Sequence, residues 1–249
     1  MNNKAKAVFR RAAGFIWPEL CAGCGRPIEF ERSGTDALCE DCFEKWEREK
    51  QSERDQYGTF PSFVVNTKTG IGVLYAARYG IDEELIAPEI IYKLKSRATK
   101  RMVDFATFEL LTMMNRAMPE LFDGRIPKKD ITVTFIPRRP EAVSDSGFDH
   151  MKLCAKRFAG LTGIGFSDLL AHRLNSPEQK LLTAEEREFN IRQSLIFRRG
   201  EGQAPTRLTI LIDDIITTGS SMRAGIDLLS EHGVEDVLCA ALLITNSTN

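Results

Sequence analysis

The hydrophobic positions of this sequence form two patterns, short continuous apolar runs and longer segments in which apolar residues recur at helical spacing. The continuous runs are strand-length and apolar, and they cover residues 71–79, 131–136, 206–212 and 237–245, of which residues 131–136 are largely β-branched. Such runs predict buried strands. The second run ends at Pro137, which suits a strand followed by a loop.

Helical spacing fills the segments between these runs. Residues 83–118 alternate apolar and charged positions as two helices with a break near residues 95–98. A further helix is predicted over residues 150–161, and an amphipathic helix over residues 220–232 that Gly233 ends. Strands separated by helices of this length predict an α/β fold, a parallel sheet with helices on both faces.

Four of the six cysteines form two pairs, each with two residues between its members. Cys21 and Cys24 make the first pair, and Cys39 and Cys42 make the second. Two such turns can present four thiolates as a tetrahedron, which Zn²⁺ prefers in a closed structural site. Stray pairs or a redox pair are the alternatives, and we favour a structural zinc that holds together a ribbon too small to fold alone.

The cysteine quartet belongs to a predicted zinc-ribbon domain at residues 1–55, which begins with a basic, helical lead-in. Its last part, residues 44–54, is mostly charged and suits an exposed helix end or linker. The sheet domain is predicted over residues 60–249. The other two cysteines, Cys154 and Cys239, stand in apolar stretches and suit buried free thiols.

Composition narrows the range of partners. The formal net charge of the 249 residues is -1 and the pI is near 6.4, so no global positive field would draw the protein to nucleic acid. The apolar runs are far shorter than the roughly 20 residues that span a bilayer, so we expect no membrane span. The N-terminus lacks the apolar core and cleavage site of a secretory signal, which predicts a cytoplasmic protein.

The most informative segment comprises residues 209–221, which begin within the predicted strand over residues 206–212. The strand delivers Asp213 and Asp214 to the carboxyl edge of the sheet, where two adjacent acids are costly unless a ligand uses them. Ribose 2′- and 3′-hydroxyls, or a metal bound to them, are suitable partners. The acids would therefore serve both binding and catalysis.

A hydroxyl-rich turn then opens the helix at Thr217, Thr218, Gly219, Ser220 and Ser221. The free N–H groups and the dipole of a helix start form an anion site, and a glycine permits close approach of the backbone. An ordinary N-capped helix is the alternative, but it explains only the hydroxyls and not the paired acids. Acids for a diol beside a phosphate site describe a ribose 5-phosphate ligand.

This segment resembles the diphosphoribose-binding signature of type I phosphoribosyltransferases. The resemblance implies a five-stranded parallel sheet under a smaller hood, a Mg²⁺ requirement, and transfer of ribose 5-phosphate from 5-phosphoribosyl 1-diphosphate with loss of pyrophosphate. Enzymes of this group that use 6-oxopurines have an aspartate where this chain has Thr217, which argues against hypoxanthine or guanine as acceptor.

With the cysteine quartet included, the chain resembles the ComF family, which is linked in bacteria to competence and DNA uptake. The resemblance runs from Cys21 to the end and includes Lys95, which precedes the pyrophosphate loop of that family. It also covers residues 136–148 and a segment between hood and core that contains Leu170, Arg173, Gln179, Arg187 and Asn190. It implies proteins of the DNA-uptake machinery as candidate partners.

The sequence departs from the family in the half that would hold pyrophosphate. Residues 140–146 contain no arginine, Ser146 stands where arginine is usual, and the loop after Lys95 lacks the usual glycine. The residues that remain as pyrophosphate contacts are Lys95, Ser96, Arg97, Arg138 and Arg139. A solvated basic face is the alternative for the basic residues near Lys95. His150 stands in place of a glutamine, and we favour a surface or capping role for it.

These features support three hypotheses. The first is a Mg²⁺-dependent phosphoribosyltransferase in which Asp213, Asp214 and Lys95 carry the chemistry. The second, motivated by the missing arginines, is an accessory protein of DNA uptake that binds the nucleotide precursor without turnover. The third, direct binding of single-stranded DNA through the zinc ribbon, is the least favoured because the net charge is small and few aromatic residues flank the cysteines.

Overall fold

A computed structural model of the chain describes residues 20–28, 37–57, 62–65, 71–80, 85–173, 194–198 and 206–245. The predicted helical lead-in lies outside these residues except for Leu20, and so do Gln179, Arg187 and Asn190. None of the helices in the described ranges combines the length and the apolarity needed to cross a bilayer.

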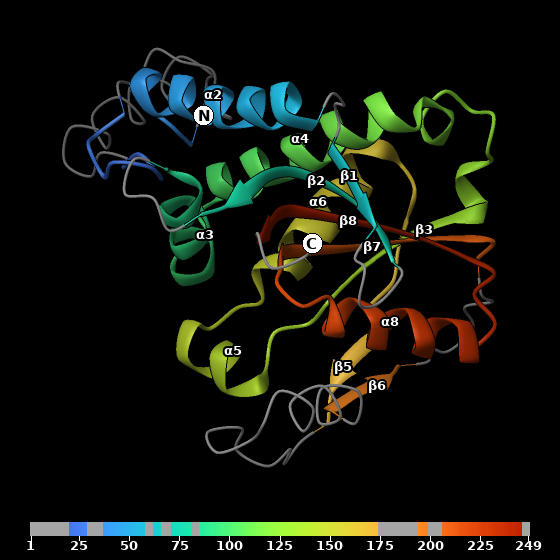
Figure 1. Cartoon of the computed structure of the whole chain (residues 1–249). Helices are drawn as coiled ribbons and strands as arrows, with labels where there is room; N and C mark the ends of the chain where they lie inside the picture. The colour runs from blue at the N-terminus through green and yellow to red at the C-terminus, as the bar shows by residue number, and fades with distance from the viewer. Residues whose placement is uncertain are drawn as a thin grey trace, which may run out of the picture.

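A six-stranded sheet forms the centre of the molecule (Figure 1). Its strands, in spatial order, are β1 (Ser62–Val65), β2 (Gly72–Tyr79), β8 (Asp236–Thr245), β7 (Leu208–Ile216), β3 (Ile131–Phe135) and β4 (Gly165–Phe166). Only β1 is antiparallel to its neighbour, so five strands form the parallel sheet that the sequence predicts. β7 continues past the predicted end at residue 212, and both aspartates therefore lie in the strand.

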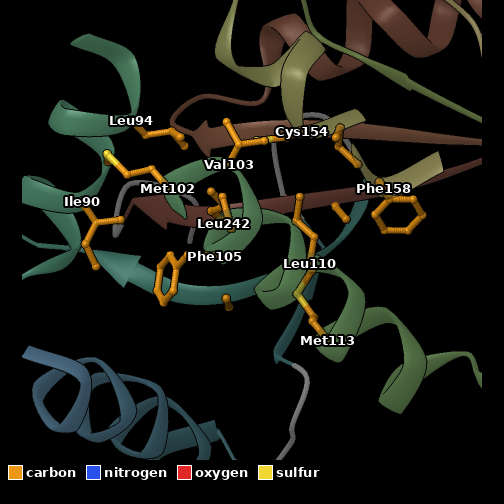
Figure 2. Close-up of a cluster of buried hydrophobic side chains, with 14 of the residues drawn as sticks. Ile90, Leu94, Met102, Val103, Phe105, Leu110, Met113, Cys154, Phe158 and Leu242 are labelled. Atoms are coloured by element: carbon orange, nitrogen blue, oxygen red, sulfur yellow. The ribbon is translucent and has the colours of Figure 1, made fainter. Parts of the chain in front are cut away.

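Helices cover both faces of the sheet, as predicted (Figure 1). On one face lie α4 (Lys100–Ala117) and α6 (His150–Thr162), whose apolar side chains pack with those of the sheet around Leu110, Phe158 and Leu242 (Figure 2). On the other face lies α8 (Ser220–Glu231). A two-stranded hood of β5 (Leu170–His172) and β6 (Leu195–Phe197) packs beside α8.

Two further helices pack beside the sheet, α2 (Glu40–Tyr57) and α3 (Ala87–Ser96), and a short helix α5 (Pro140–Ser146) follows β3. Short 3-10 turns occupy Pro119–Leu121 and Lys128–Asp130. The break predicted near residues 95–98 is confirmed, because α3 ends at Ser96 and α4 begins at Lys100. Cys154 and Cys239 are buried free thiols, also as predicted.

The interpretation of residues 44–54 as an exposed helix end or linker is only partly right, because the segment is helical and Glu44, Lys45 and Arg48 are exposed, but Trp46 and Lys50 are buried. They lie within α2, and the buried ring of Trp46 meets Phe105 of α4 edge-on at 5.8 Å between ring centroids. Residues 20–28 and 37–57, which contain the four paired cysteines, are called the cysteine unit. Its residues Ala22 and Leu38 belong to the same buried cluster as Phe105. The cysteine unit and the sheet unit therefore share one hydrophobic core.

An ion pair crosses the same contact between α2 and α4. Lys50 Nζ lies 2.9 Å from Glu109 Oε2 and 2.5 Å from Glu47 Oε1, and the side chains of Lys50 and Glu109 are only 6% and 14% exposed. We expect Lys50→Met to lower the free energy of unfolding by about 3 kcal/mol, because Glu109 would keep its charge in a buried place after losing this cation.

Urea unfolding at neutral pH measures the loss. The matched control is Arg48→Met on the same helix, since the Arg48–Glu44 pair is exposed and 3.9 Å long. Exposed pairs contribute little, so this variant should unfold like the parent. Equal losses in the two variants would show that burial does not set the strength of the Lys50 contact.

Candidate functional site

Two adjacent aspartates stand near the carboxyl end of β7. Side chains of successive strand residues point to opposite faces, so the two carboxylates enter different surroundings. Asp213 is half-buried, whereas Asp214 is 5% exposed. The amide of Asp214 donates to Asp213 Oδ1 at 2.8 Å. The acid pair is therefore held as a unit with one member reaching solvent.

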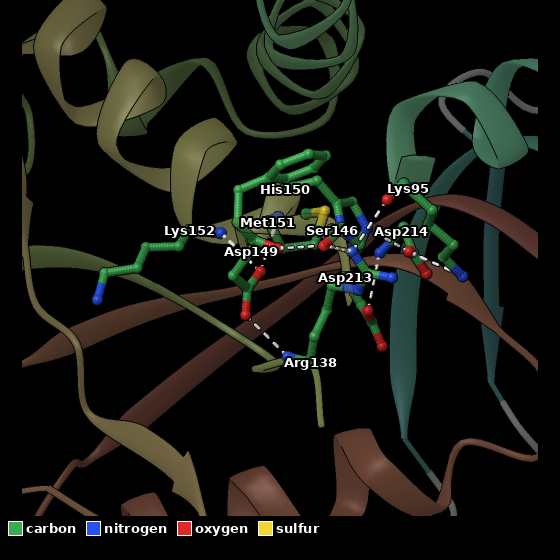
Figure 3. Close-up of polar contacts among 10 residues, drawn as sticks. Lys95, Arg138, Ser146, Asp149, His150, Met151, Lys152, Asp213 and Asp214 are labelled. Carbon is green, nitrogen blue, oxygen red and sulfur yellow. Dashed lines mark hydrogen bonds and ion pairs between the residues drawn. The ribbon is translucent and has the colours of Figure 1, made fainter. Parts of the chain in front are cut away.

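Asp214 joins three elements (Figure 3). Its Oδ2 lies 2.9 Å from Lys95 Nζ, at the end of α3, and 2.5 Å from Nε2 of His150, the first residue of α6. Burial raises the pKa of Asp214, but the hydrogen bond from His150 and the charge of Lys95 outweigh burial and bring the pKa below its usual range. Asp214 is thus ionised, and His150 Nε2 is the donor.

Asp213 has the opposite balance. Burial and the neighbouring charge of Asp214 raise the pKa of Asp213 well above its usual range. The hydrogen bond from the Asp214 amide and the charge of Lys95 offset only part of this increase. An ionised Asp213 therefore makes the folded protein less stable. Hydroxyl donors or a cation at this edge would remove that cost, which is the chemistry expected of a sugar diol or a bound Mg²⁺.

The hydroxyl-rich turn comes directly after β7. Thr217 and Thr218 are exposed, and Gly219 takes a left-handed backbone with φ +78° just before α8 begins at Ser220, as predicted. Thr218 Oγ1 and Ser220 Oγ are 2.9 Å apart. The N-cap residue Gly219 has no side chain to cap α8, and the Ser220 amide donates to Thr218 Oγ1 in a long hydrogen bond of 3.4 Å. This weakly capped helix start can offer backbone N–H groups to an anion.

Arg138, three residues after the end of β3 at Phe135, forms hydrogen bonds with three other residues of the protein. Its guanidinium donates to Lys95 O at 2.9 Å and to Ser146 Oγ at 3.0 Å, and its amide donates to Asp149 Oδ2 at 2.8 Å (Figure 3). Lys95 and Arg138 thus come together next to the acids, and their role as pyrophosphate contacts stays a prediction. The other three predicted contacts, Ser96, Arg97 and Arg139, are exposed side chains around this edge.

The loop after α3 keeps an unusual backbone. Ala98 has φ +37°, and it is the non-glycine residue with positive φ in the part of the chain that the structure describes. The left-handed region costs a residue with a Cβ about 1 kcal/mol. At this alanine the loop thus has a conformation that glycine adopts more easily.

The surface or capping role predicted for His150 is wrong. His150 is 1% exposed, and the cap of α6 is Asp149, which accepts from the amides of Met151 and Lys152. Among the described residues, His150 Nδ1 has no hydrogen-bond partner. A usable signal was present in the sequence, because His150, Cys154 and Phe158 recur every four residues on the buried face of that helix.

The four cysteines of the ribbon come together as predicted. Their sulfur atoms all lie within 4.8 Å of one another, and those of Cys24 and Cys39 are 3.7 Å apart. Zinc–sulfur bonds of about 2.3 Å in a tetrahedron put sulfur atoms about 3.8 Å apart. Cys21 Sγ also accepts from the amides of Gly23 and Cys39 at 3.3 and 3.2 Å. The cluster therefore fits a closed tetrahedral zinc site.

The exposed side of the cluster is bordered by Arg26. Its Nε donates to Cys24 Sγ at 3.2 Å, and its Nη2 lies 2.5 Å from Asp41 Oδ2. Burial raises the pKa of Cys24, but hydrogen bonds from Arg26 and the neighbouring cysteines outweigh burial and bring the pKa down to about 6. Cys24 is therefore ready to bind a cation as thiolate at neutral pH.

Gly23 gives a test of the zinc site. A Cβ at this position would lie 2.6 Å from Cys42 Sγ, closer than real atoms approach. Gly23→Ala should therefore displace a ligand and lower zinc affinity at least about ten-fold, as measured by competition with a chelating dye. Gly160→Ala is the control: it is an exposed helical site with nothing within 4 Å of the added Cβ, so zinc affinity should not change. Unaltered affinity in Gly23→Ala would contradict the site.

The two aspartates should respond oppositely to amidation. Because the pKa of Asp213 is raised in the folded protein, Asp213 contributes favourably to the free energy of unfolding below the pKa of the unfolded chain, about 3.9. This contribution is lost as the pH rises through the pKa of the folded protein. Asp213→Asn should thus stabilise the protein at pH 7, and the gain should shrink toward pH 4. The lowered pKa of Asp214 gives stability that is present above the unfolded value, so Asp214→Asn should lose about 2 kcal/mol at pH 7.

Chemical denaturation of both variants at several pH values measures these differences. The variants serve as controls for each other, because each replaces one carboxylate of the same pair by an isosteric amide. Destabilisation of both variants at pH 7 would contradict the opposite directions of the two pKa shifts.

Comparison with known proteins agrees with the chemistry of the turn. Residues 167–249 match the phosphoribosyl transferase domain family, and this match contains β7, the turn and α8. No curated protein matches the sequence. Among solved structures, an adenine phosphoribosyltransferase has 16% identity, with coverage of 81% of this chain and 89% of the other and a TM-score of 0.39.

Two further solved structures are similar. A purine phosphoribosyltransferase from Pyrococcus horikoshii has 14% identity, covers 61% of this chain and 78% of its own, and has a TM-score of 0.35. The allosteric regulatory enzyme of purine biosynthesis has 23% identity and a TM-score of 0.30 over 45% of this chain, which spans only 21% of that enzyme. The chain has a five-stranded parallel sheet, and its residues 167–249, about a third of the chain, match the phosphoribosyl transferase domain.

Proposed function

We propose that this chain is a ComF-like protein that binds 5-phosphoribosyl 1-diphosphate with Mg²⁺ and transfers the phosphoribosyl group to an acceptor, with release of pyrophosphate. The observation that carries the proposal is the end of β7, where a half-buried acid with a raised pKa stands four residues before a hydroxyl-rich turn whose first two residues, Thr217 and Thr218, are exposed. The domain match over this segment supports it.

The start of α8 would hold the 5-phosphate. Thr217, Thr218 and Ser221 offer hydroxyl donors, and Gly219 lets the backbone approach the phosphate closely. The α8 dipole adds a favourable field for an anion, and the first turn of α8 contains no acidic residue that would oppose it. A phosphate anchored here would fix the ribose ring beside β7.

Asp213 would hold the ribose diol. Its carboxylate can accept hydrogen bonds from two hydroxyls, and those donors would lower its raised pKa by stabilising the charge. Asp214, buried and already bound by Lys95 and His150, would support the site from behind. The two acids, which the sequence alone cannot distinguish, therefore receive different roles in the proposal.

The pyrophosphate would leave on the α3 side. The bond from C1 to the pyrophosphate oxygen breaks, the electron pair departs with pyrophosphate, and C1 forms a bond to the acceptor. Lys95, whose side chain is 36% exposed, can turn from Asp214 to the leaving group, and Arg97 is exposed beside it. Mg²⁺ bound with the diphosphate, next to Asp213, would offset further negative charge.

The cysteine quartet with this domain gives the ComF-like architecture. We therefore propose a role in DNA uptake or competence in the cytoplasm, with proteins of that machinery as partners. The proposal is supported by the geometry of the zinc cluster and by the shared core that ties it to the sheet.

A second candidate function is binding without turnover. It is favoured by Arg138, whose guanidinium is engaged by Lys95 O and Ser146 Oγ, so that one of the few cations near the leaving group already has internal partners. A site that holds ribose 5-phosphate well and pyrophosphate weakly would sense the nucleotide precursor for the uptake machinery.

Two measurements test the proposal. Calorimetric titration with the diphosphate and Mg²⁺ should show binding to the wild type, and Asp213→Ala with Asp214→Ala should lower affinity at least about 100-fold because charged hydrogen-bond acceptors are lost. Asp236→Ala is the control, since this exposed acid starts β8 at the other edge of the sheet. Equal affinity in wild type and double variant would refute the assignment.

Release of pyrophosphate, monitored with a panel of nucleobases and amines, then separates the two candidates. Release with any acceptor supports transfer. Tight binding of the diphosphate with no release for any member of the panel supports the sensor.

A further inference from the structure

Helix α3 lies between the cysteine cluster and the acid pair. Lys93 and Lys95 are two residues apart and thus about 200° apart around the helix, so their side chains leave it on opposite sides. Lys93 Nζ donates to the carbonyl oxygens of Gly23 at 2.9 Å and Cys21 at 3.4 Å, while Lys95 pairs with Asp214. One helix therefore contacts both the zinc ligand loop and the candidate active site.

The cysteine unit also holds the beginning of α3. The N-cap residue Ile86 provides no side-chain cap, and the carboxylate of Glu49 from α2 replaces it. Glu49 Oε1 accepts from the Ile86 amide at 2.6 Å, and Oε2 accepts from the Ala87 amide at 3.3 Å. A carboxylate at this end also interacts favourably with the helix dipole. The start and the side of α3 are thus both bound by residues that precede the sheet in the sequence.

The remaining contacts leave α3 little freedom to move alone. Ile90 and Leu94 are buried on the core together with Met102 of α4 (Figure 2). At its end, Lys95 O accepts from Arg138. Buried helices shift between discrete packings rather than sliding continuously. The position of α3 is therefore determined jointly by the core, Arg138 and the cysteine unit.

The direction of the Gly23 carbonyl depends on the cysteine turn. Gly23 lies between two ligands, and its amide donates to Cys21 Sγ. Its Cα has no room for a Cβ beside Cys42 Sγ. A metal ion bound by the four cysteines would hold the Gly23 peptide in place and keep its carbonyl oxygen facing Lys93. Without the metal ion the thiols would no longer hold the loop together, and this peptide could turn away.

We propose that Glu49 and Lys93 are positioning residues through which the zinc ribbon fixes α3 and so places Lys95 for the diphosphate. The inference rests on the proposed function for its ligand. It gives the metal a second role besides folding of the ribbon, because loss of zinc would loosen α3 and weaken diphosphate binding at a distance. Neither residue touches the ligand in this scheme.

Hydrogen–deuterium exchange of the full-length, zinc-loaded protein tests the hold on α3. Lys93→Met keeps the aliphatic stem but loses both hydrogen bonds to the ligand loop, and Glu49→Gln keeps the size but loses the charge. Amides in α3 should exchange about ten-fold faster in each variant, while zinc content and exchange in α6 stay unchanged. Lys93→Arg, which keeps a cationic donor, should restore slow exchange.

Lys129→Met is the matched control, because Lys129 is an exposed lysine in a turn that packs beside neither α3 nor the cysteines. Removal of zinc from the wild type with a chelator should reproduce the faster exchange of α3. Exchange that is unchanged in both Lys93→Met and Glu49→Gln would overturn the proposal.

Affinity for the diphosphate tests the placement of Lys95. Lys93→Met should weaken binding about ten-fold, and the loss should vanish in a Lys95→Met background, since one residue acts through the other. Equal losses in both backgrounds, or no loss despite faster exchange, would overturn the placement. If the wild type binds no diphosphate, the proposed function fails, and the exchange experiment still decides whether the ribbon holds α3.

Discussion

The carboxylate of Asp214 is the contact on which the candidate site depends. A charge this deeply buried is tolerated only with partners, and both partners come from elements far away in the sequence, Lys95 from α3 and His150 from α6. The strand that supplies Asp214 is central in the sheet and cannot shift without breaking two ladders. One acid therefore aligns two helices with the turn at the end of β7.

Adjacent aspartates look equivalent in the sequence, but the strand pleat separates them. Asp214 is stabilised as an anion by its surroundings, whereas Asp213 is opposed by burial and by Asp214 itself. A residue that lowers the stability of its own fold is typical of a binding site, where a ligand supplies the missing partners. The opposite pKa shifts of the two acids are thus evidence about function that the sequence motif alone does not give.

Much of the fold was predictable because burial leaves a local pattern. Parallel strands are apolar on both faces, and the hydroxyl-rich turn marks the start of α8 by its own chemistry. The role of Lys93 was not predictable, since its partner is a backbone carbonyl 70 residues away. The packing of α2 was missed for a related reason: its buried residues include one tryptophan and a salt-bridged lysine, which stand among charged residues and give no apolar pattern in the sequence.

The alanine at position 98 gives the loop after α3 two opposing properties. Its left-handed backbone raises the energy of the conformation observed, by an amount that glycine would avoid. Alanine also has fewer conformations to lose than glycine when a loop becomes ordered. A loop of this kind is strained but has few alternative conformations, so ordering it around an anion would cost less conformational entropy than ordering a loop with glycine at this position.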